Sequence, residues 1–494
     1  MQKILLGKQV KELDALFVSE SGISSYQLME RAANKFCQWF IAHFKKGCKI
    51  NICCGTGNNG GDGLAIARLL SEQGYVINVA IIGNPEKRSI DFINNLKELP
   101  RSIALSNWRD LKSAEITIDA IFGVGINRAL EGEYLDLVQK LNKEQGVKIS
   151  VDMPSGLPSD TPADGEVFHA DHTVSFQFPK LSLLFPEHAK YVGELVIKKI
   201  GMEPKHFDSF SSSYRFFSGE SLSSYHKKFH SFSHKGDFGR IVLIGGSYGK
   251  MGSICLSIKA SLRTGAGLVF CKVPGCGVNI VQSSIPEAMV LPPSLERDID
   301  TNLEFSGIDA IGIGPGLGTG ENAQKLVRKV LKSFAGPTVV DADAINILGE
   351  KRDWINLLHS NVILTPHLKE FERLTGVKSD NHLQRIELAK EFCMKHNCSL
   401  VLKGAFSVLS FPDGSQVFNN SGTVYMATGG SGDVLTGMLT SFLGQGYTMK
   451  QAAICGVFHH GHAGELAGKA LRRGTMASDI VENIPKSFLD WDIK

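Results

Sequence analysis

The stretch ATGGSGDVLTGML, residues 427–439, is the most specific pattern in this chain of 494 residues. Its glycines lead into an apolar helical run, an arrangement that leaves backbone N–H groups free to hold an anion at the start of a helix. Asp433 falls in the first turn of that helix. As a plain cap it would only stabilise the helix. Because capping does not require so many glycines, the pattern favours a carboxylate that takes a proton from a hydroxyl group attacking a phosphoryl group.

The segments before this stretch alternate between short apolar runs and amphipathic runs, which predicts a mostly parallel sheet with helical crossovers. The predicted strands are GRIVLIGG (239–246), GLVFCKV (267–273), DAIGIG (309–314), PTVVD (337–341), NVILTP (361–366) and SLVLKG (399–404). Three strand ends carry polar groups or glycines that could face a ligand. They are Lys403 with Gly404 and Ser407, His367, and the glycine loop GPGLG (314–318).

The N-terminal half shows the same alternation. Its predicted strands are KINICC (49–54), YVINVAII (75–82), ITIDAIF (116–122), VKISVDM (147–153) and HTVSF (172–176), with helices over 64–73 and 134–145. A serine-rich segment, residues 207–233, interrupts the rhythm and is interpreted as a docked inter-domain connection. No repeat relates the two halves. The sequence therefore predicts an α/β protein of two domains, residues 1–212 and 222–494.

The N-terminal half has its own glycine loop, GTGNNGGDG, at residues 55–63. It lies between a predicted strand and a predicted helix, where it could approach a phosphate. The acid that a dinucleotide fingerprint needs about 20 residues later is missing from VINVAIIGN. Asp62 would also repel a phosphate inside such a loop. The loop is therefore expected to hold something besides phosphate, such as a cation or a hydroxyl-bearing ring; a simple helix cap is the alternative.

Two further acids close strands of this half. Asp119 ends ITID and Asp152 lies in VDMPSG, followed by Ser155. A single strand-end aspartate is usually a turn or cap residue. However, ligands of parallel sheets bind at the carboxyl ends of the strands, so these loops should converge on the loop of Asn59. The oxygens of Asn59, Asp119 and Ser155 suit an alkali or alkaline-earth cation.

The motifs GTGNNGGDGLAIAR, DAIFGVGINR and VDMPSG with FPK resemble the epimerase half of the NAD(P)H-hydrate repair enzymes over about residues 1–210. The resemblance implies a Rossmann-like parallel sheet, interconversion of R and S hydrates, and a potassium ion held by Asn59, Asp119 and Ser155. Asp152 would contact the substrate, and Asp119 would be the acid–base group, although one aspartate need not serve both roles equally well. The dinucleotide would lie against Asn58, Asn59, Gly60, Gly61, Asp62, Gly123, Val124, Gly125, Ile126, Asn127, Arg128 and Ala129.

The C-terminal motifs GPGLG, TPHLKEFERL, KGA, ATGGSGDVLTG and ASDI resemble the ribokinase-like dehydratase half of the same family over about residues 225–490. The resemblance implies ADP as co-substrate, with AMP and phosphate as products, and a Mg²⁺ ion could accompany the nucleotide. Asp433 would activate the substrate's hydroxyl group. The adenine nucleotide would bind Lys403, Gly404, Ala405, Phe406, Ser407 and Gly432, and the hydrated cofactor would bind Ser253, Gly316, His367 and Asp433. Many relatives carry Ala and Thr where this chain has Ser253 and Ser407.

Composition excludes several other classes of protein. The formal net charge of +3 gives no electrostatic reason to expect a nucleic-acid partner. No apolar stretch reaches the roughly 18 residues that a membrane span needs, and a cytoplasmic location is expected. The ten cysteines lack zinc-ligand spacing. His459, His460 and His462 do not share one helix face, so a structural role is predicted for them. Relatives suggest a homo-oligomer.

Two alternatives stay open. The glycine–aspartate motif also fits a ribokinase-like small-molecule kinase with an accessory nucleotide-binding domain, which would phosphorylate an alcohol without eliminating the phosphate. A third interpretation makes the N-terminal domain a binding module without activity. The GTGNNGGDG domain argues against the kinase, and the joint presence of Asp119, Asp152 and Ser155 argues against a mere binding module.

Overall fold

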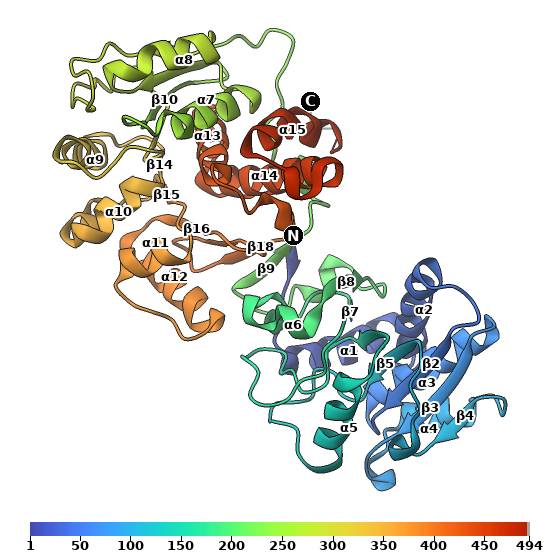
Figure 1. Cartoon of the computed structure of the whole chain (residues 1–494). Helices are drawn as coiled ribbons and strands as arrows, with labels where there is room; N and C mark the ends of the chain where they lie inside the picture. The colour runs from blue at the N-terminus through green and yellow to red at the C-terminus, as the bar shows by residue number, and fades with distance from the viewer. Residues whose placement is uncertain (492–494) are drawn as a thin grey trace. The chain divides into compact units, whose positions relative to one another are not determined.

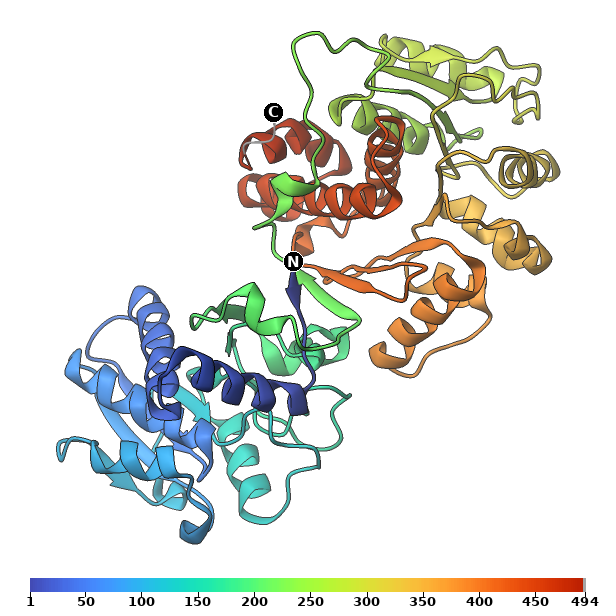
Figure 2. The same ribbon diagram turned by 180° about the vertical axis from the view of Figure 1, so that it is seen from behind.

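The computed structural model describes residues 1–491 and divides into two compact units (Figures 1 and 2). The first unit comprises Gln2–Ser212 with Asn381–Leu383, and the second comprises Met1, Ser213–Asp380 and the chain from Gln384 onwards. Both are α/β units built on parallel strands. Within residues 1–491, none of the helices combines the length and apolar character that crossing a bilayer requires.

The N-terminal unit contains a parallel seven-stranded sheet in the order β4-β3-β2-β5-β6-β7-β8. Chain order reverses between β2 and β5, and crevices at such switch points are where open α/β sheets bind ligands. The strands of this unit are β1 (Gln2–Lys3), β2 (Lys49–Cys54), β3 (Val76–Ile81), β4 (Ala104–Ser106), β5 (Ile116–Ala120), β6 (Val147–Val151), β7 (His172–Phe176) and β8 (Glu194–Lys198). Its helices are α1 (Gly7–Ser21), α2 (Ser25–His43), α3 (Asn58–Glu72), α4 (Ile90–Lys97), α5 (Gly132–Lys143) and α6 (Ala189–Val192).

Alternation along β2 explains how helices cover both faces of this sheet. Ile50, Ile52 and Cys54 belong to the apolar core under α1 to α4, whereas Cys53 points into a second core that includes Leu137 of α5. Side chains of a strand alternate between faces, so a nearly continuous apolar strand must be covered twice. The view from behind brings α1 to the front of the sheet (Figure 2).

The C-terminal unit is built on strands in the order β9-β18-β17-β16-β15-β14-β13-β10-β11-β12. The run from β12 to β16 is parallel, and β16, β17 and β18 pair antiparallel. The strands are β9 (Tyr214–Phe217), β10 (Arg240–Ile244), β11 (Leu268–Lys272), β12 (Met289–Val290), β13 (Ala310–Ile313), β14 (Thr338–Val340), β15 (Val362–Leu364), β16 (Ser399–Leu402), β17 (Val408–Ser410) and β18 (Gln416–Asn419).

Helices cover the C-terminal sheet on its two faces, with α7, α13, α14 and α15 on one side and α9 to α12 on the other (Figure 1). These helices are α7 (Met251–Arg263), α8 (Val278–Ser284), α9 (Glu321–Ser333), α10 (Ala342–Glu350), α11 (Leu368–Thr375), α12 (His382–His396), α13 (Ser431–Gly444), α14 (Met449–Leu471) and α15 (Ala477–Leu489). The apolar run of α13 is buried from Val434 to Gly444, which fixes the helix and with it the position of Asp433.

The serine-rich segment 207–233 is docked, as expected, and it also contributes a strand that the sequence did not predict. Tyr214–Phe217 forms β9, which pairs in parallel with β18. Three of its four side chains are buried, which explains why a stretch with few aliphatic residues still joins a sheet.

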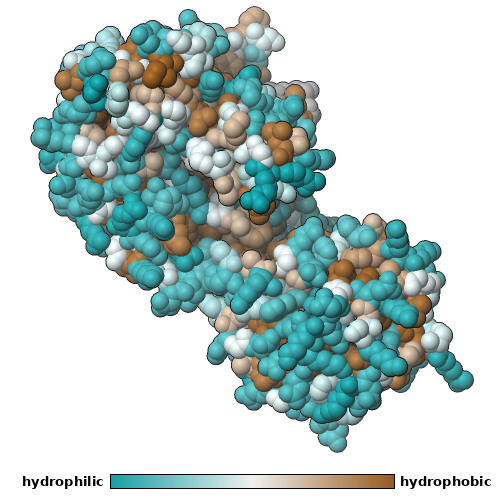
Figure 3. All heavy atoms as spheres, in the orientation of Figure 1, coloured by the Kyte–Doolittle hydropathy of each residue, from teal (hydrophilic) through white to brown (hydrophobic). Residues whose placement is uncertain are grey.

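On the visible face of each unit, hydrophobic side chains are scattered among hydrophilic ones (Figure 3).

Candidate active sites

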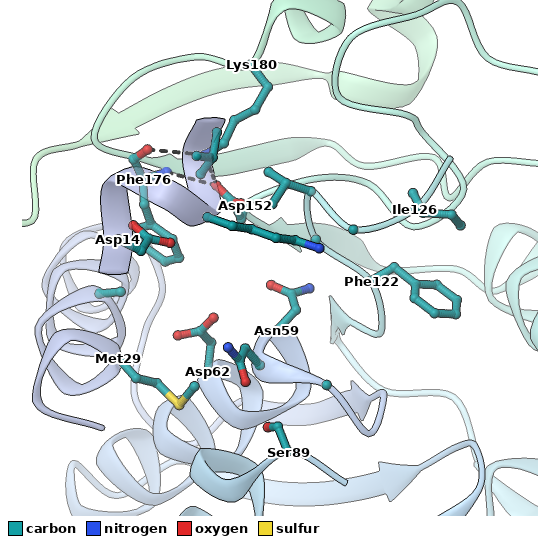
Figure 4. A pocket seen from close by; sticks show the side chains of 18 of the residues that line it. Asp14, Met29, Asn59, Asp62, Ser89, Phe122, Ile126, Asp152, Phe176 and Lys180 are labelled. Atoms are coloured by element: carbon teal, nitrogen blue, oxygen red, sulfur yellow. Dashed lines mark hydrogen bonds and ion pairs between the residues drawn. The ribbon is translucent and has the colours of Figure 1, made fainter. Parts of the chain in front are cut away.

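A cavity of about 1220 Å³ opens at the carboxyl edge of the N-terminal sheet. Its lining comes from the glycine loop, from the segment after β5, from Asp152 after β6 and from α1 (Figure 4). Of the predicted dinucleotide residues, all seven of the segment Gly123–Ala129 line this cavity, as do Asn58, Asn59 and Asp62. The structure therefore brings together most of what the sequence assigned to one site.

Gly60 and Gly61 do not line the cavity but make the loop behind it. A Cβ on Gly60 would lie 1.9 Å from the carbonyl oxygen of Gly55, and one on Gly55 would lie 2.1 Å from that of Ile121. Side chains cannot fit into such gaps. The glycines therefore press the loop against the chain that follows β5, which places Asn59 beside Gly123.

Asp119 is fully buried at the end of β5 and lies outside the cavity lining. Its Oδ1 accepts hydrogen bonds from the Ser155 hydroxyl (2.6 Å) and the Ile121 N–H (3.2 Å). Its Oδ2 accepts from the Ser150 hydroxyl (2.9 Å) and the Ser155 N–H (2.8 Å). Burial raises the pKa of Asp119, and these four donors oppose the rise. The carboxyl group thus fastens the loop of Ser155 to the strand end.

Asp152 forms an ion pair with Lys180, whose side chain is only 2% exposed. Asp152 has φ of 67°, an uncommon value for a residue with a Cβ, so the surrounding contacts must hold this backbone in place. Lys180 also donates to the Ser175 hydroxyl (3.1 Å) and the Phe176 carbonyl (3.2 Å). Figure 4 shows this pair across the open space from Asn59 and Asp62.

Asp14 and Asp62 also line the cavity, but their carboxyl groups are not held by hydrogen bonds or an ion pair within residues 1–491 as those of Asp119 and Asp152 are. Burial raises the pKa of Asp14 to about 6, with Lys180 opposing and Asp152 reinforcing the rise. Burial also raises the pKa of Asp62 well above its usual range, and Asp152 and Asp14 add to the effect. Strongly shifted carboxyl groups in a cleft are candidates for proton transfer.

Sequence reasoning missed Asp14 and Lys180 as parts of this site. Lys180 lies in the FPK motif directly after β7, so the strand-end rule applied to Asp152 could have found it. Asp14 gave no signal, because it lies on α1, before the first strand of the sheet that carries the cavity.

In the C-terminal unit, Asp433 occupies the first turn of α13, after Gly430, which has φ of 92°. Burial raises the pKa of Asp433 to about 6, the charge of Asp341 adds to the rise, and a hydrogen bond from Ser253 opposes it. Ser253 lies on α7 and also adjoins Gly316, since a Cβ on Gly316 would lie 3.1 Å from that of Ser253. Three predicted residues from distant parts of the chain therefore meet here.

Lys403 and Asp341 form an ion pair close to Asp433. The Lys403 Nζ lies 2.8 Å from Asp341 Oδ1, and the Thr436 hydroxyl donates to Asp341 Oδ2 at 2.7 Å. Asp341 is buried, and burial alone would raise its pKa, but the Lys403 ammonium and the surrounding hydrogen bonds bring the pKa below its usual value. A Cβ on Gly432 would lie 3.1 Å from Lys403 Nζ, so the amine stands at the start of α13. A basic group at a helix N-terminus favours a phosphate there.

The remaining predicted residues surround this point at strand ends. Ser407 and Gly404 close a turn after β16, in which the Ser407 hydroxyl donates to the Gly404 carbonyl at 3.1 Å. His367 caps α11 by accepting from the N–H groups of Lys369 (3.1 Å) and Glu370 (3.3 Å). The exposed Ala405 and the half-buried Phe406 lie in the same turn as Ser407.

The histidines of α14 do not form a metal site, and within residues 1–491 no cluster of three metal-ligating side chains occurs. His459 is buried, with its Nε2 atom 2.9 Å from Nε2 of His226 and its Nδ1 atom 3.0 Å from the hydroxyl oxygen of Ser487. His460 meets the Ser431 carbonyl at 2.9 Å and so supports the start of α13. These contacts agree with the structural role predicted for the histidines, which stays a prediction.

Two family models match the chain. One is described as NAD(P)H-hydrate dehydratase and covers residues 241–486, and the other is described as YjeF-related protein N-terminus and covers residues 25–182. A ribokinase-like superfamily protein from Enterococcus faecalis matches the structure with a TM-score of 0.50 at 25% identity, covering 58% of this chain and 99% of that one. The two-domain α/β architecture with a ribokinase-like C-terminal half is confirmed.

Curated relatives match over nearly the whole length. The bifunctional NAD(P)H-hydrate repair enzyme Nnr of Moorella thermoacetica is 34% identical over 507 residues, covering 98% of this chain and 96% of the relative. The enzyme of the same name from Escherichia coli is 32% identical over 94% of this chain and 90% of its own length. With matches of this identity and extent, the chain belongs to the family of bifunctional NAD(P)H-hydrate repair enzymes.

Proposed function

We propose that this chain repairs hydrated NADH and NADPH in two steps. The N-terminal unit interconverts the R and S hydrates, and the C-terminal unit dehydrates the S hydrate at the expense of ADP, releasing NAD(P)H, AMP and phosphate. The observation that carries the proposal is the position of Asp433, whose carboxyl group has no ion-pair partner within residues 1–491 and lies at the N-terminus of α13 beside Lys403.

The dehydration follows from this placement. Asp433 removes the proton of the C6 hydroxyl, whose oxygen attacks the terminal phosphoryl group of the nucleotide. The free N–H groups of α13 and the Lys403 ammonium stabilise the negative charge that develops on the phosphoryl oxygens. The resulting phosphate ester leaves as phosphate, and loss of a C5 proton restores the dihydropyridine ring. Gly432 has no side chain, so the nucleotide can approach the helix closely.

The ligands would be held by the residues assigned to them from the sequence. The nucleotide lies against Lys403 to Ser407 and Gly432, and the hydrated cofactor lies against Ser253, Gly316 and His367. A Mg²⁺ ion would accompany the nucleotide phosphates. Carboxylate oxygens suit this ion, and the carboxylates of Asp341 and Asp343 are near enough to Asp433 for their charges to raise its pKa.

Potassium in the N-terminal unit would be held by Asn59, Asp119 and Ser155, as the resemblance implies, and Asn59 supplies the structural support for it. The Nδ2 atom of Asn59 is buried without a hydrogen-bond partner among the described residues. Amide oxygen and nitrogen atoms are nearly interchangeable in shape, and turning the amide would present an oxygen at this place. Potassium is a hard cation that oxygen atoms bind, and when bound it would supply positive charge near the hydroxyl group of the substrate. A homo-oligomeric state and a cytoplasmic location remain predictions.

One experiment tests the function. The full-length protein is incubated with a mixture of R and S NADH hydrates, with and without ADP, while the absorbance of reduced nicotinamide is followed. Complete conversion that requires ADP is expected, and parallel reactions with ATP decide the choice of nucleotide. A small-molecule kinase would leave the absorbance unchanged, and conversion of only the S half would show that the N-terminal unit is a binding module.

A further inference from the structure

Two carboxyl groups of the N-terminal cavity, those of Asp62 and Asp14, have no hydrogen-bond or ion-pair partner within residues 1–491, and both line the open space. They come from different helices, α3 and α1. Figure 4 shows both carboxyl groups directed into the cavity. The other two acids considered for this site are held fast: Asp119 accepts four hydrogen bonds, and Asp152 is paired with Lys180.

We propose that Asp62 and Asp14 are the proton-transfer pair of the epimerisation, with Asp62 protonating the departing C6 hydroxyl and Asp14 accepting the proton of the water that returns. The proposal rests on the proposed function of the N-terminal unit and deepens it. It moves the acid–base role, assigned from the sequence to Asp119, to residues that border the cavity.

The alternative, proton transfer by Asp119, conflicts with its surroundings. Asp119 is fully buried and outside the lining, and each of its oxygens already accepts two hydrogen bonds. A carboxylate in such a setting has no free lone pair directed at a substrate. A proton added to the Asp119 carboxylate would also point at one of the N–H or O–H groups that now donate to it. Asp119 is therefore suited to holding the strand-end loops in place.

The charges around each group assign the two roles. Burial raises the pKa of Asp62 well above its usual range, and the carboxylates of Asp152, Asp14 and Asp91 add to the rise while Lys180 opposes it, which favours the protonated form of Asp62. Asp14 is affected more by the Lys180 ammonium than by Asp152, and its pKa of about 6 leaves it mostly ionised at neutral pH. One acid and one base are thus available at the same pH.

Cations occupy other parts of the same lining. Lys11, Lys87 and Arg128 border the cavity without an ion pair recorded within residues 1–491, and the Lys11 ammonium lies 3.7 Å from where a Cβ of Gly125 would be. These groups fit the pyrophosphate of a dinucleotide and would direct its tetrahydropyridine ring toward the carboxyl groups.

The step balances in atoms and electrons. Asp62 gives its proton to the hydroxyl on C6, the C6–O bond breaks, water leaves, and the lone pair of ring nitrogen N1 forms the N1=C6 double bond. A water molecule then attacks C6 from the opposite face while Asp14 takes one of its protons, and the electrons of the double bond return to N1. The product is the other epimer. Proton exchange with solvent returns Asp62 to its acid form and Asp14 to its base form, and no oxidant or co-reactant is consumed.

The test compares Asp62→Asn, Asp14→Asn and Asp119→Asn in the full-length protein, with Asp136→Asn on the exposed side of α5 as the matched control. R hydrate is supplied, and its conversion to S hydrate is followed by chromatography. We expect kcat to fall at least 100-fold for the first two variants, or to the rate without enzyme, with little change in KM. The Asp136 variant should match the native protein.

A pH profile separates proton transfer from a structural role. Native epimerisation should rise with pH through about 6, where Asp14 becomes ionised, and fall at higher pH as Asp62 loses its proton. Asp14→Asn should abolish the rise, and Asp14→Glu should restore it. Near-native epimerisation by Asp62→Asn or Asp14→Asn would overturn the proposal. Thermal unfolding and dehydration of S hydrate by the same chains check that each variant is folded. A native protein unable to epimerise R hydrate would instead refute the proposed function.

Discussion

Replacing Asp433 by Asn tests the dehydratase chemistry most directly. The change keeps the size of the side chain and removes the base. Because the pKa of Asp433 is about 6, roughly nine in ten molecules carry the carboxylate at pH 7. A positioned general base contributes about 10²- to 10⁴-fold to a rate. We therefore expect kcat for dehydration of S hydrate to fall about 10²- to 10⁴-fold, with epimerisation unchanged.

The same replacement should stabilise the fold at neutral pH. Raising a carboxyl pKa from 3.8 to about 6 means that ionised Asp433 costs the folded state about 3 kcal/mol. This pKa shift is a net value that already includes the favourable interaction of the carboxylate with the N-terminus of α13, so a neutral amide of the same size should be about 3 kcal/mol more stable. Stability associated with this group is fully present below pH 3.8 and is lost as pH rises through about 6. The Asn variant should therefore be the more stable protein at pH 8 and should lose this advantage at pH 4.

Two assays of the full-length protein check these values. Dehydration of purified S hydrate with ADP is followed by absorbance, and calorimetric unfolding is recorded at pH 4, 6 and 8. Glu321→Gln is the control, because it removes an exposed first-turn carboxylate of α9 and should leave dehydration unchanged. A variant that keeps more than a tenth of native kcat, or that is less stable than the native protein at pH 8, would refute the reasoning.

Three further outcomes are expected. Ser253→Ala removes a hydrogen bond that lowers the pKa of Asp433, so the rise of dehydration with pH should shift upward from about 6; an unchanged profile of kcat against pH would contradict this. Gly60→Ala places a Cβ 1.9 Å from the carbonyl oxygen of Gly55 and should lower the free energy of unfolding by about 1–3 kcal/mol. Gly57→Ala is the control, because the space around Gly57 is open, and it should leave the thermal midpoint unchanged. Exchanging K⁺ for tetramethylammonium should slow epimerisation at least tenfold, and an equal rate in both buffers would exclude a potassium requirement.

Much of the fold could be predicted because strands and helices of these domains alternate in the sequence. The segments around Lys49–Cys54 and Arg240–Ile244 are apolar on both faces, as strands covered by helices must be. The hairpin of β17 and β18 was not predicted, since the expected rhythm places a helix after each strand. Its signal was the turn FPDGS at residues 411–415, between Val408–Ser410 and Gln416–Asn419.

The candidate sites were predictable wherever a polar residue ends a strand, because parallel strands bring their carboxyl ends to one edge. Asp152 and Lys403 follow this rule. Asp14 does not, since α1 reaches the cavity only through the packing of Val10, Leu13 and Phe17 into the core. A contact made by tertiary packing of a helix leaves no spacing in the sequence by which it could be recognised.

Both units place a carboxylate paired with lysine next to acids without such a partner. Lys403 holds Asp341 ionised, and the charge of Asp341 raises the pKa of Asp433. In the N-terminal unit, Lys180 is paired with Asp152, whose charge raises the pKa of Asp62. The ion pair is too well coordinated to exchange protons with a substrate, but it fixes the charge that its neighbour experiences. The lysines therefore determine which carboxyl group stays ionised, and the charge of that group raises the pKa of the carboxyl group beside it.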